Sequence, residues 1–176
     1  MNKLKQLEVC GQSLWLDDLR RDLIEKGELR SLIKCDGLKG ITSNPSTFER
    51  AISETDEYAN ALKEFQAQSD HSISAIYEHL AIADIRAAAD VLRPVYEQTH
   101  GRDGYISLEC SPYLANDTEA TVSEAQRLWA AVDRSNLMVK SSVRRRSPFP
   151  FNRALSTSSN ERTPFASQKT RLAAPD

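Results

Sequence analysis

Apolar residues along the first 140 positions follow two alternating patterns. Short, mostly apolar runs that are typical of buried strands occur at 13–17, 40–45, 105–110 and 136–139. Between them lie longer segments in which leucine, isoleucine and alanine recur at helical spacing, at 18–37, 72–99 and 116–133. Strands that alternate with helices predict an α/β fold of parallel βα units, because parallel neighbours need a crossover connection.

Glycine and proline set the expected ends of several helices. Gly27 and Gly37 are placed to stop the helical pattern of 18–37, and Pro45 is placed to begin the helix after the second strand. Pro94 lies inside the longest helical segment, and we expect it to end or bend that helix.

The pattern stops after Lys140. Residues 141–176 show no sustained apolar period, and three prolines interrupt any element that might be drawn there, at Pro148, Pro150 and Pro164. This composition predicts a disordered tail. We therefore divide the chain into a folded unit at 1–140 and a basic, Ser/Pro/Arg-rich tail at 141–176.

The charge of the chain changes at the same place. The net charge of −2 conceals seven basic and two acidic residues in 141–176, a net +5, against sixteen basic and twenty-three acidic residues in 1–140, a net −7. The run Arg144–Arg146 is of a type that attracts nucleic acid or an acidic membrane. A solvated tail without a specific nucleic-acid partner is favoured, because aromatic residues are sparse and no nucleic-acid motif accompanies the run.

Composition argues against several other classes. No apolar run approaches the ~18 residues that would span a membrane, and the N-terminal sequence lacks the features of a signal peptide. The three cysteines are scattered and lack CxxC spacing, and the three histidines lack metal-ligand spacing. We therefore expect a cytoplasmic protein without disulfides, a metal site or membrane attachment.

Polar side chains stand at or just beyond the end of each predicted strand. They are Asp17 after the first, Thr42 and Asn44 in the second, Glu109 in the third and Lys140 after the fourth. In a parallel βα sheet or barrel the carboxyl ends of the strands lie at one edge, where such folds place their chemistry. The five residues are therefore predicted to converge on one site.

A lysine amine between two carboxylates suits imine chemistry. An amine that is half-buried loses solvation of its ammonium form, which lowers its pKa and increases the share of free amine. The free amine adds to a ketone and gives a carbinolamine and then an imine. The protonated imine withdraws electrons from the adjacent carbon–carbon bond and permits retro-aldol cleavage, for which two acids can move the protons.

Each of these residues also has an ordinary structural interpretation. A lysine after a strand is usually a surface residue, and Asp17 can cap the helix that follows it. Glu109 is harder to explain in this way, because it interrupts an otherwise apolar run. The combination therefore carries more information than any single member.

Four stretches of the sequence resemble successive blocks of transaldolase, in its longer bacterial branch. They are "GQSLWLDDLRRDLI", "GITSNPSTFERAI", "GYISLECSPYLANDTEAT" and "RLWAAVDRSNLMVK", and they run in order as far as Lys140. The resemblance implies a (β/α)8 TIM barrel, of which this chain supplies about four βα units. It also implies transfer of a dihydroxyacetone unit from a ketose phosphate to an aldose phosphate in the pentose phosphate pathway, with no metal or organic cofactor.

The resemblance also assigns roles to individual residues. Lys140 matches the imine-forming lysine of the family, and Asp17 matches the aspartate that acts as acid and base on the sugar hydroxyl. Glu109 matches the glutamate that works with a catalytic water. Thr42 and Asn44 match the segment that positions substrate hydroxyls. The positions of the predicted strand ends identify the same five residues independently of the resemblance.

The sequence departs from the family after Lys140. In the family this lysine is usually followed by valine, proline, alanine and threonine, then by a helix and four more βα units, whereas here "SSVRRRSPFP" follows. The abrupt change of charge and proline content is typical of a reading-frame change near codon 140. Translation of the DNA in a reading frame shifted by one base should then continue the barrel sequence. A shifted frame without such a sequence would contradict this hypothesis.

These 176 residues are expected to have little or no transaldolase activity. A (β/α)8 barrel needs about 250 residues, and the serine and arginine residues with which the family holds the sugar phosphate lie downstream of the lysine. Arg144–Arg146 do not align with them. The open strand edges of a half-barrel are also expected to favour self-association.

Two other functions stay open. Simple aldol cleavage of a small sugar phosphate would use the same lysine and release a free three-carbon product without an acceptor. An inert fragment or interaction module, whose basic tail binds polyanions, would instead show salt-sensitive retention of the tail on heparin.

Overall fold

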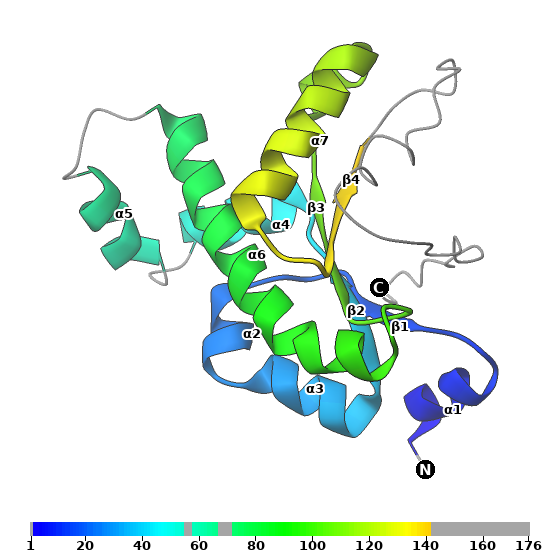
Figure 1. The fold of residues 1–176 in the computed structure, drawn as a ribbon. Helices are drawn as coiled ribbons and strands as arrows, with labels where there is room; N and C mark the ends of the chain where they lie inside the picture. The colour runs from blue at the N-terminus through cyan, green and yellow to red at the C-terminus, as the bar shows by residue number, and fades with distance from the viewer. Residues whose placement is uncertain (1, 55–57, 67–71, 142–176) are drawn as a thin grey trace.

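The computed structural model describes residues 2–54, 58–66 and 72–141 (Figure 1). One sheet contains the strands β1 (Leu14–Leu16), β2 (Leu38–Thr42), β3 (Tyr105–Glu109) and β4 (Leu137–Lys140). The strands lie in the order β1-β2-β3-β4, and every neighbouring pair is parallel. The predicted α/β fold of parallel βα units is confirmed, and the arrangement agrees with about half of a (β/α)8 barrel.

Apart from the first, which precedes β1, the helices of the described ranges fill the connections between the strands. They are α1 (Lys3–Val9), α2 (Arg21–Glu25), α3 (Glu28–Asp36), α4 (Pro45–Glu54), α5 (Ala59–Gln66), α6 (Ile73–Gln98) and α7 (Thr118–Val132), and a 3₁₀ turn lies at Pro112–Leu114. Helix α6 packs against β2 and β3, and α7 packs against β4 and α6. Figure 1 shows α2, α3 and α6 on one side of the sheet, with α5 farther out. None of these helices combines the length and the apolar character needed to cross a bilayer.

The core lies between the sheet and these helices. Ile41 of β2 and Ile106 of β3 are completely buried, and they meet Ile85 and Leu92 of α6 in the same apolar cluster. Leu29 of α3 joins this cluster. Burial of aliphatic side chains of this size contributes about 1.5–3 kcal/mol each, so this layer fixes the positions of the strands.

The predicted roles of Gly27, Gly37 and Pro45 are confirmed. Gly27 separates α2 from α3, and Gly37 ends α3 with φ near 77° while its amide donates to the carbonyl of Leu32. This left-handed conformation is one that glycine adopts without steric cost. Pro45 is the first residue of α4.

The sequence predicts that Pro94 ends or bends the longest helix; an end at this residue is wrong, and a bend stays a prediction. Helix α6 continues through Pro94 to Gln98. A proline inside a helix costs about 3 kcal/mol, because it removes a hydrogen bond and its ring crowds the preceding turn. Leu92 and Val95 are buried on either side of it, and their packing holds the helix together against this local cost.

The opposite face of the sheet carries polar and aromatic side chains. Trp15 of β1 lies directly over Gly40 of β2, where a Cβ atom would come within 2.5 Å of the indole ring. Farther along, Ser107 of β3 donates a hydrogen bond to Thr42 of β2. Met138 of β4 is 40% exposed. This face would point into the interior if the sheet were part of a closed barrel.

The tail predicted at 141–176 lies outside the described residues, apart from Ser141. Strand β4 ends at Lys140, which is where the apolar pattern of the sequence stops. The predicted boundary between a folded unit and a disordered tail stays a prediction.

Candidate active site

The strand ends place the predicted site residues along one edge of the sheet. Thr42, Glu109 and Lys140 are the last residues of β2, β3 and β4. Asp17 directly follows β1, and Asn44 lies two residues beyond β2. Because the strands are parallel, all five positions lie at the carboxyl edge of the sheet, where βα folds carry their active sites.

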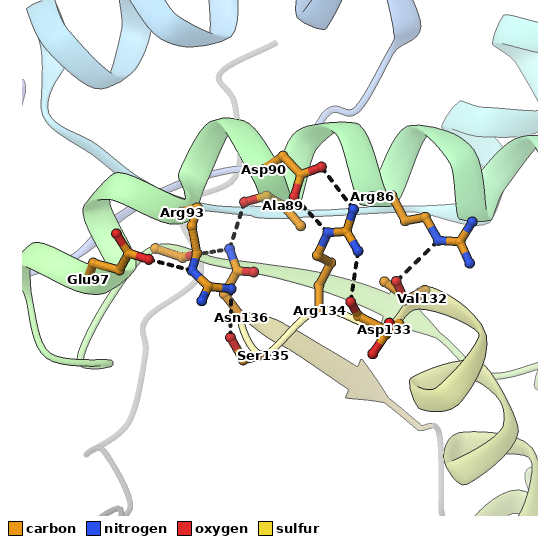
Figure 2. A network of polar contacts seen from close by, with 11 residues as sticks. Arg86, Ala89, Asp90, Arg93, Glu97, Val132, Asp133, Arg134, Ser135 and Asn136 are labelled. Atoms are coloured by element: carbon orange, nitrogen blue, oxygen red, sulfur yellow. Dashed lines mark hydrogen bonds and ion pairs between the residues drawn. The ribbon is translucent and has the colours of Figure 1, made fainter.

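Buried hydrogen bonds fix the start of β4. Asn136 is completely buried, and its side-chain amide donates to the carbonyl of Ala89 at 2.8 Å and to that of Gly104 at 2.9 Å. The main-chain carbonyl of Asn136 accepts from the main-chain amide of Ile106 at 3.0 Å. Asn136 therefore ties the beginning of β4 to α6 and to β3, four residues before Lys140 (Figure 2).

Two arginines hold the turn that leads into β4 against helix α6 (Figure 2). Arg86 donates to the carbonyls of Ala131 and Val132, which belong to the last turn of α7 and have no partner within that helix. Arg134 pairs with Asp90 through contacts of 2.6 and 3.1 Å. The end of α7 and the start of β4 are thus fixed on one helix.

Replacing Asn136 with alanine is expected to lower the free energy of unfolding by about 2–4 kcal/mol, because two buried carbonyls lose their donor. Urea unfolding of the two proteins measures this change. Ser135→Ala is the matched control, since Ser135 accepts a hydrogen bond from Arg93 at an exposed position. Equal and small effects of both substitutions would show that Asn136 does not anchor the strand.

Lys140 lies among acceptors from two neighbouring strands. Its ammonium nitrogen is 2.6 Å from the hydroxyl oxygen of Thr42 and 3.0 Å from the carbonyl oxygen of Ser43. The nearer carboxylate oxygen of Glu109 is 3.7 Å away. Glu109 and Lys140 are also direct partners in the register of β3 and β4. The structure therefore brings together three of the five predicted residues, Lys140, Glu109 and Thr42.

Two serines complete this group and were not predicted from the sequence. The buried hydroxyl of Ser43 donates to the carbonyl of Ser107 at 2.7 Å, and the hydroxyl of Ser107 donates to Thr42 at 3.0 Å. These bonds hold the end of β2 against β3. A period of two along β3, which places Ser107 on the same face as Glu109, is the signal that identifies Ser107.

Asp17 lies at the other edge of the sheet. Strands β2 and β3 separate β1 from β4, and at about 4.8 Å between neighbours the outer strands are ~14 Å apart along the sheet. Asp17 is exposed. The structure thus places Asp17 on the predicted edge, at a distance from Lys140 that a direct ion pair does not bridge.

A pocket of about 460 Å³ opens between the carboxyl edge of the sheet and the helices. We call it the helix-side pocket. Its lining comes from residues in 43–49, 73–85, 108–113 and 124–128. Asn44 and Glu109 both line it, so Glu109 stands between the pocket and the amine of Lys140. The backbone carbonyl of Asn44 accepts from the amides of Thr47 and Phe48 in the first turn of α4.

The helix-side pocket favours protonated groups. Burial raises the pKa of Tyr77, and the carboxylates of Glu49 and Glu109 raise it further. Burial also raises the pKa of the Cys110 thiol to about 11, with smaller effects of Glu124 and Glu109. Both groups therefore stay protonated at neutral pH. Within the described ranges no cluster of three His, Cys, Asp or Glu side chains is arranged to hold a metal ion.

The geometry suits a reaction in which an amine and a carboxylate act together. The amine of Lys140 stands at the open edge of the sheet with its side chain 36% exposed, so a small carbonyl compound can reach it. Glu109 is the nearest carboxylate that can take up or return a proton. Hydroxyl and carbonyl groups on β2 surround the same point and can bind a polyhydroxylated ligand.

Known proteins resemble this chain over most of its length. It is 50% identical over 139 residues to a transaldolase of Trichodesmium erythraeum, and 49% identical over 140 residues to a transaldolase of Thiobacillus denitrificans. It is 48% identical over 139 residues to transaldolase 2 of Nostoc punctiforme. These alignments cover 79–80% of the chain but only 36–39% of the relatives, so the chain spans well under half of their length.

The match extends over all four strands of the sheet. The family model described as Transaldolase/Fructose-6-phosphate aldolase matches residues 14–146, which run from the first residue of β1 to beyond the end of β4. The parallel order of the strands agrees with the fold that the sequence predicts for this family. With three relatives close to 50% identity and a family match over three quarters of its length, the chain belongs to the transaldolase/fructose-6-phosphate aldolase family.

Proposed function

We propose that this chain carries the lysine half of a transaldolase site, with Lys140 as the amine that forms an imine with the donor ketose phosphate. The observation that carries this proposal is the position of the Lys140 nitrogen, 2.6 Å from Thr42 and 3.7 Å from Glu109 at the carboxyl edge of a parallel sheet. Membership of the family supports it. The donated unit is a three-carbon dihydroxyacetone group, and the acceptor is an aldose phosphate.

Imine formation at Lys140 explains how a carbon–carbon bond of the donor ketose phosphate breaks. The amine adds to the ketone carbon, and loss of water from the carbinolamine leaves a protonated imine. This cation draws electrons from the neighbouring carbon–carbon bond as the hydroxyl of the departing aldehyde loses its proton. The three-carbon unit stays on Lys140 as an enamine, which attacks the acceptor aldehyde, and hydrolysis of the new imine frees the amine.

We assign the proton transfers to the two carboxylates. Glu109 is close enough to the lysine nitrogen, at 3.7 Å, to exchange protons with the carbinolamine through a water molecule. Asp17 takes the proton of the hydroxyl next to the bond that breaks. Asp17 follows β1, and Lys140 ends β4, three strands away in the sheet. The bound substrate must therefore extend from β4 toward β1. The curvature of the sheet must also bring the Asp17 carboxylate closer to the Lys140 nitrogen than the distance along a flat sheet.

The polar residues of β2 are assigned to substrate hydroxyls. Thr42 already contacts the lysine nitrogen, and Ser107 holds its hydroxyl from the neighbouring strand. Asn44 faces the helix-side pocket and offers both a donor and an acceptor. A triol substrate can therefore replace the contacts that Thr42 and Ser43 make with the lysine.

The 176-residue chain on its own is proposed to complete this reaction poorly. The described residues supply four strands, whereas a (β/α)8 barrel has eight. The residues with which the family is expected to hold the phosphate are not matched in residues 1–140. A substrate that is held loosely loses orientation, and misplacement by about 1 Å can lower a rate ~100-fold.

A transfer assay and an imine trap test the two parts separately. With fructose 6-phosphate as donor and an aldose phosphate as acceptor, we expect turnover about 100-fold or more below that of a full-length relative. With dihydroxyacetone and borohydride we expect a covalent adduct on the chain. Turnover equal to that of the relative would overturn the first statement. Absence of any adduct would overturn the assignment of Lys140 and favour an inert fragment.

A simple aldolase is the second candidate, because the description of the matching family names fructose-6-phosphate aldolase beside transaldolase. Both activities use the same imine, and they differ in whether the three-carbon unit leaves as free dihydroxyacetone. Release of dihydroxyacetone from fructose 6-phosphate without an acceptor would favour the aldolase. Rapid transfer of the three-carbon unit to an added aldose phosphate, with little release of free dihydroxyacetone when no acceptor is added, would favour transaldolase.

We also propose that the chain self-associates through the open edges of its sheet. In the described residues β1 and β4 are the outer strands, and Met138 of β4 is 40% exposed. Unpaired strand edges pair readily with other chains. Sedimentation at roughly micromolar concentration should show dimers or larger species, which Met138→Lys reduces and Ile73→Lys, at an exposed apolar residue of α6, does not. A monomer at every concentration would contradict this proposal.

A further inference from the structure

Ser107 places a buried hydroxyl on the strand that carries Glu109. It lies in the middle of β3, is 2% exposed, and is the register partner of Thr42 in β2. Residues two apart on a strand point to the same face, so Ser107 and Glu109 share the face that is turned away from the core. A buried hydroxyl lowers stability unless it is hydrogen-bonded, and packing alone would favour an aliphatic residue at this position.

The hydroxyl of Thr42 connects Ser107 to the lysine amine. Its oxygen accepts a hydrogen bond from Ser107 at 3.0 Å and lies 2.6 Å from the nitrogen of Lys140. A threonine hydroxyl has two lone pairs and one hydrogen. Because Ser107 occupies one lone pair, Thr42 offers the other to an N–H of the lysine, and its own hydrogen is left for a hydroxyl of the substrate.

The main chain of Ser107 fixes a second acceptor of the amine. The carbonyl of Ser107 accepts from the amide of Ser43 at 3.2 Å and from the hydroxyl of Ser43 at 2.7 Å. These two bonds hold the residue whose own carbonyl oxygen lies 3.0 Å from the Lys140 nitrogen. Ser107 thus contacts both residues of β2 and its end that face the amine, without a printed contact to the amine itself.

We propose that Ser107 is a positioning residue for imine formation and acts on Lys140 through Thr42. This inference rests on the imine proposed above. The nitrogen of a protonated imine keeps a single N–H, which needs an acceptor where the hydroxyl of Thr42 stands. Ser107 keeps a lone pair of Thr42 directed at that N–H, so it favours the step that forms the imine rather than the binding of the ketone.

Trapping rates in the full chain test this proposal. The chain is incubated with dihydroxyacetone and cyanoborohydride, and intact-protein mass spectrometry gives the maximal rate of adduct formation and the ketone concentration at half that rate. We expect Ser107→Ala to lower the maximal rate about 10-fold, because Thr42 loses the donor that orients it. The ketone concentration at half-maximal rate should change by less than about twofold. Ser107→Thr keeps the hydroxyl and should restore most of the rate.

A cycle of substitutions shows whether Ser107 acts through Thr42. Thr42→Val removes the acceptor, and in that background Ser107→Ala should change the maximal rate by less than about twofold. Thr99→Val is the matched control, because its hydroxyl donates to the carbonyl of Val95 at 2.8 Å at the end of α6, on the side of the amino end of β3. It should lower the urea midpoint without changing the trapping rate. Ser107→Cys, with a weak donor of similar size, should also lower the rate and replaces Ser107→Ala if that variant does not fold.

The outcomes separate this inference from the proposed function. An unchanged maximal rate in Ser107→Ala and Ser107→Cys would overturn the inference and leave the imine at Lys140 intact. An equal loss of rate from Ser107→Ala with and without Thr42→Val would also overturn it, because Ser107 would then act on stability or through another group. Absence of an adduct in the unsubstituted chain would overturn the function proposed for Lys140, and this inference with it.

Discussion

Lys140→Ala is expected to abolish the adduct that borohydride traps from dihydroxyacetone, lowering its yield about 10-fold or more toward the level of non-specific labelling. The reason is positional. Lys140 stands at the carboxyl edge of the sheet, where Thr42, Ser43 and Glu109 surround its nitrogen. A surface lysine forms the same imine, but without a nearby carboxylate to move protons and without hydroxyls to hold the ketone.

Lys39→Ala is the matched control for this substitution. Lys39 is also on a strand, is partly buried, and lies 2.8 Å from a carboxylate, that of Glu8. It is near the start of β2 rather than at its end, so its removal should leave the adduct unchanged within about twofold. Intact-protein mass spectrometry measures both yields. Equal loss with the two variants would show that charge pairing, and not the strand end, selects the reactive lysine.

Asp84→Ala is expected to destabilise the fold by about 3–5 kcal/mol, because it breaks a buried ion pair and leaves its partner charged. Asp84 of α6 is 4% exposed and accepts from Arg21 at 2.7 and 2.9 Å. Its second oxygen accepts from the hydroxyl of Tyr58 at 2.7 Å, and the guanidinium of Arg21 lies 4.4 Å from the centre of the Tyr58 ring. Burial raises the pKa of Tyr58 well above its usual range, so the phenol stays a donor.

Two further variants separate the loss of this pair from the loss of packing. Arg21→Leu, Tyr58→Phe and Asp84→Leu together should recover most of the stability, since no polar group is then left buried alone. Asp90→Ala removes an ion pair from an exposed position of the same helix, and it should lower the unfolding midpoint far less. Urea unfolding measures the stability of Asp84→Ala, of the triple variant and of Asp90→Ala. If the triple variant is as unstable as Asp84→Ala, the network contributes more to the free energy of unfolding than the mutual neutralisation of its charges.

The arrangement of strands and the site edge follow from short-range patterns. Ile41 and Ile106 lie in short runs of strand type, and both are completely buried beneath the helices. The polar residues that end these runs, Thr42 and Glu109, end the strands as well. Because the strands are parallel, their carboxyl ends lie at one edge of the sheet. The sequence alone could therefore predict that Lys140 and Glu109 lie close together.

Other features depend on contacts between distant residues and could not be predicted in this way. Arg21 and Asp84 are 63 positions apart, and nothing local marks either as buried. The continuation of α6 through Pro94 results from packing on both sides, which outweighs the local preference. The separation of Asp17 from Lys140 follows from the order of the strands in the sheet, which the sequence pattern does not specify.

A crystal structure of the chain after borohydride reduction with dihydroxyacetone is the most direct measurement of whether two distant strand ends form one reactive site. We predict a three-carbon group on the nitrogen of Lys140, directed toward Thr42 and Asn44, with a carboxylate oxygen of Glu109 still near the 3.7 Å seen here. An adduct on another lysine, or a modified Lys140 turned into solvent away from Glu109 and Thr42, would contradict the shared site.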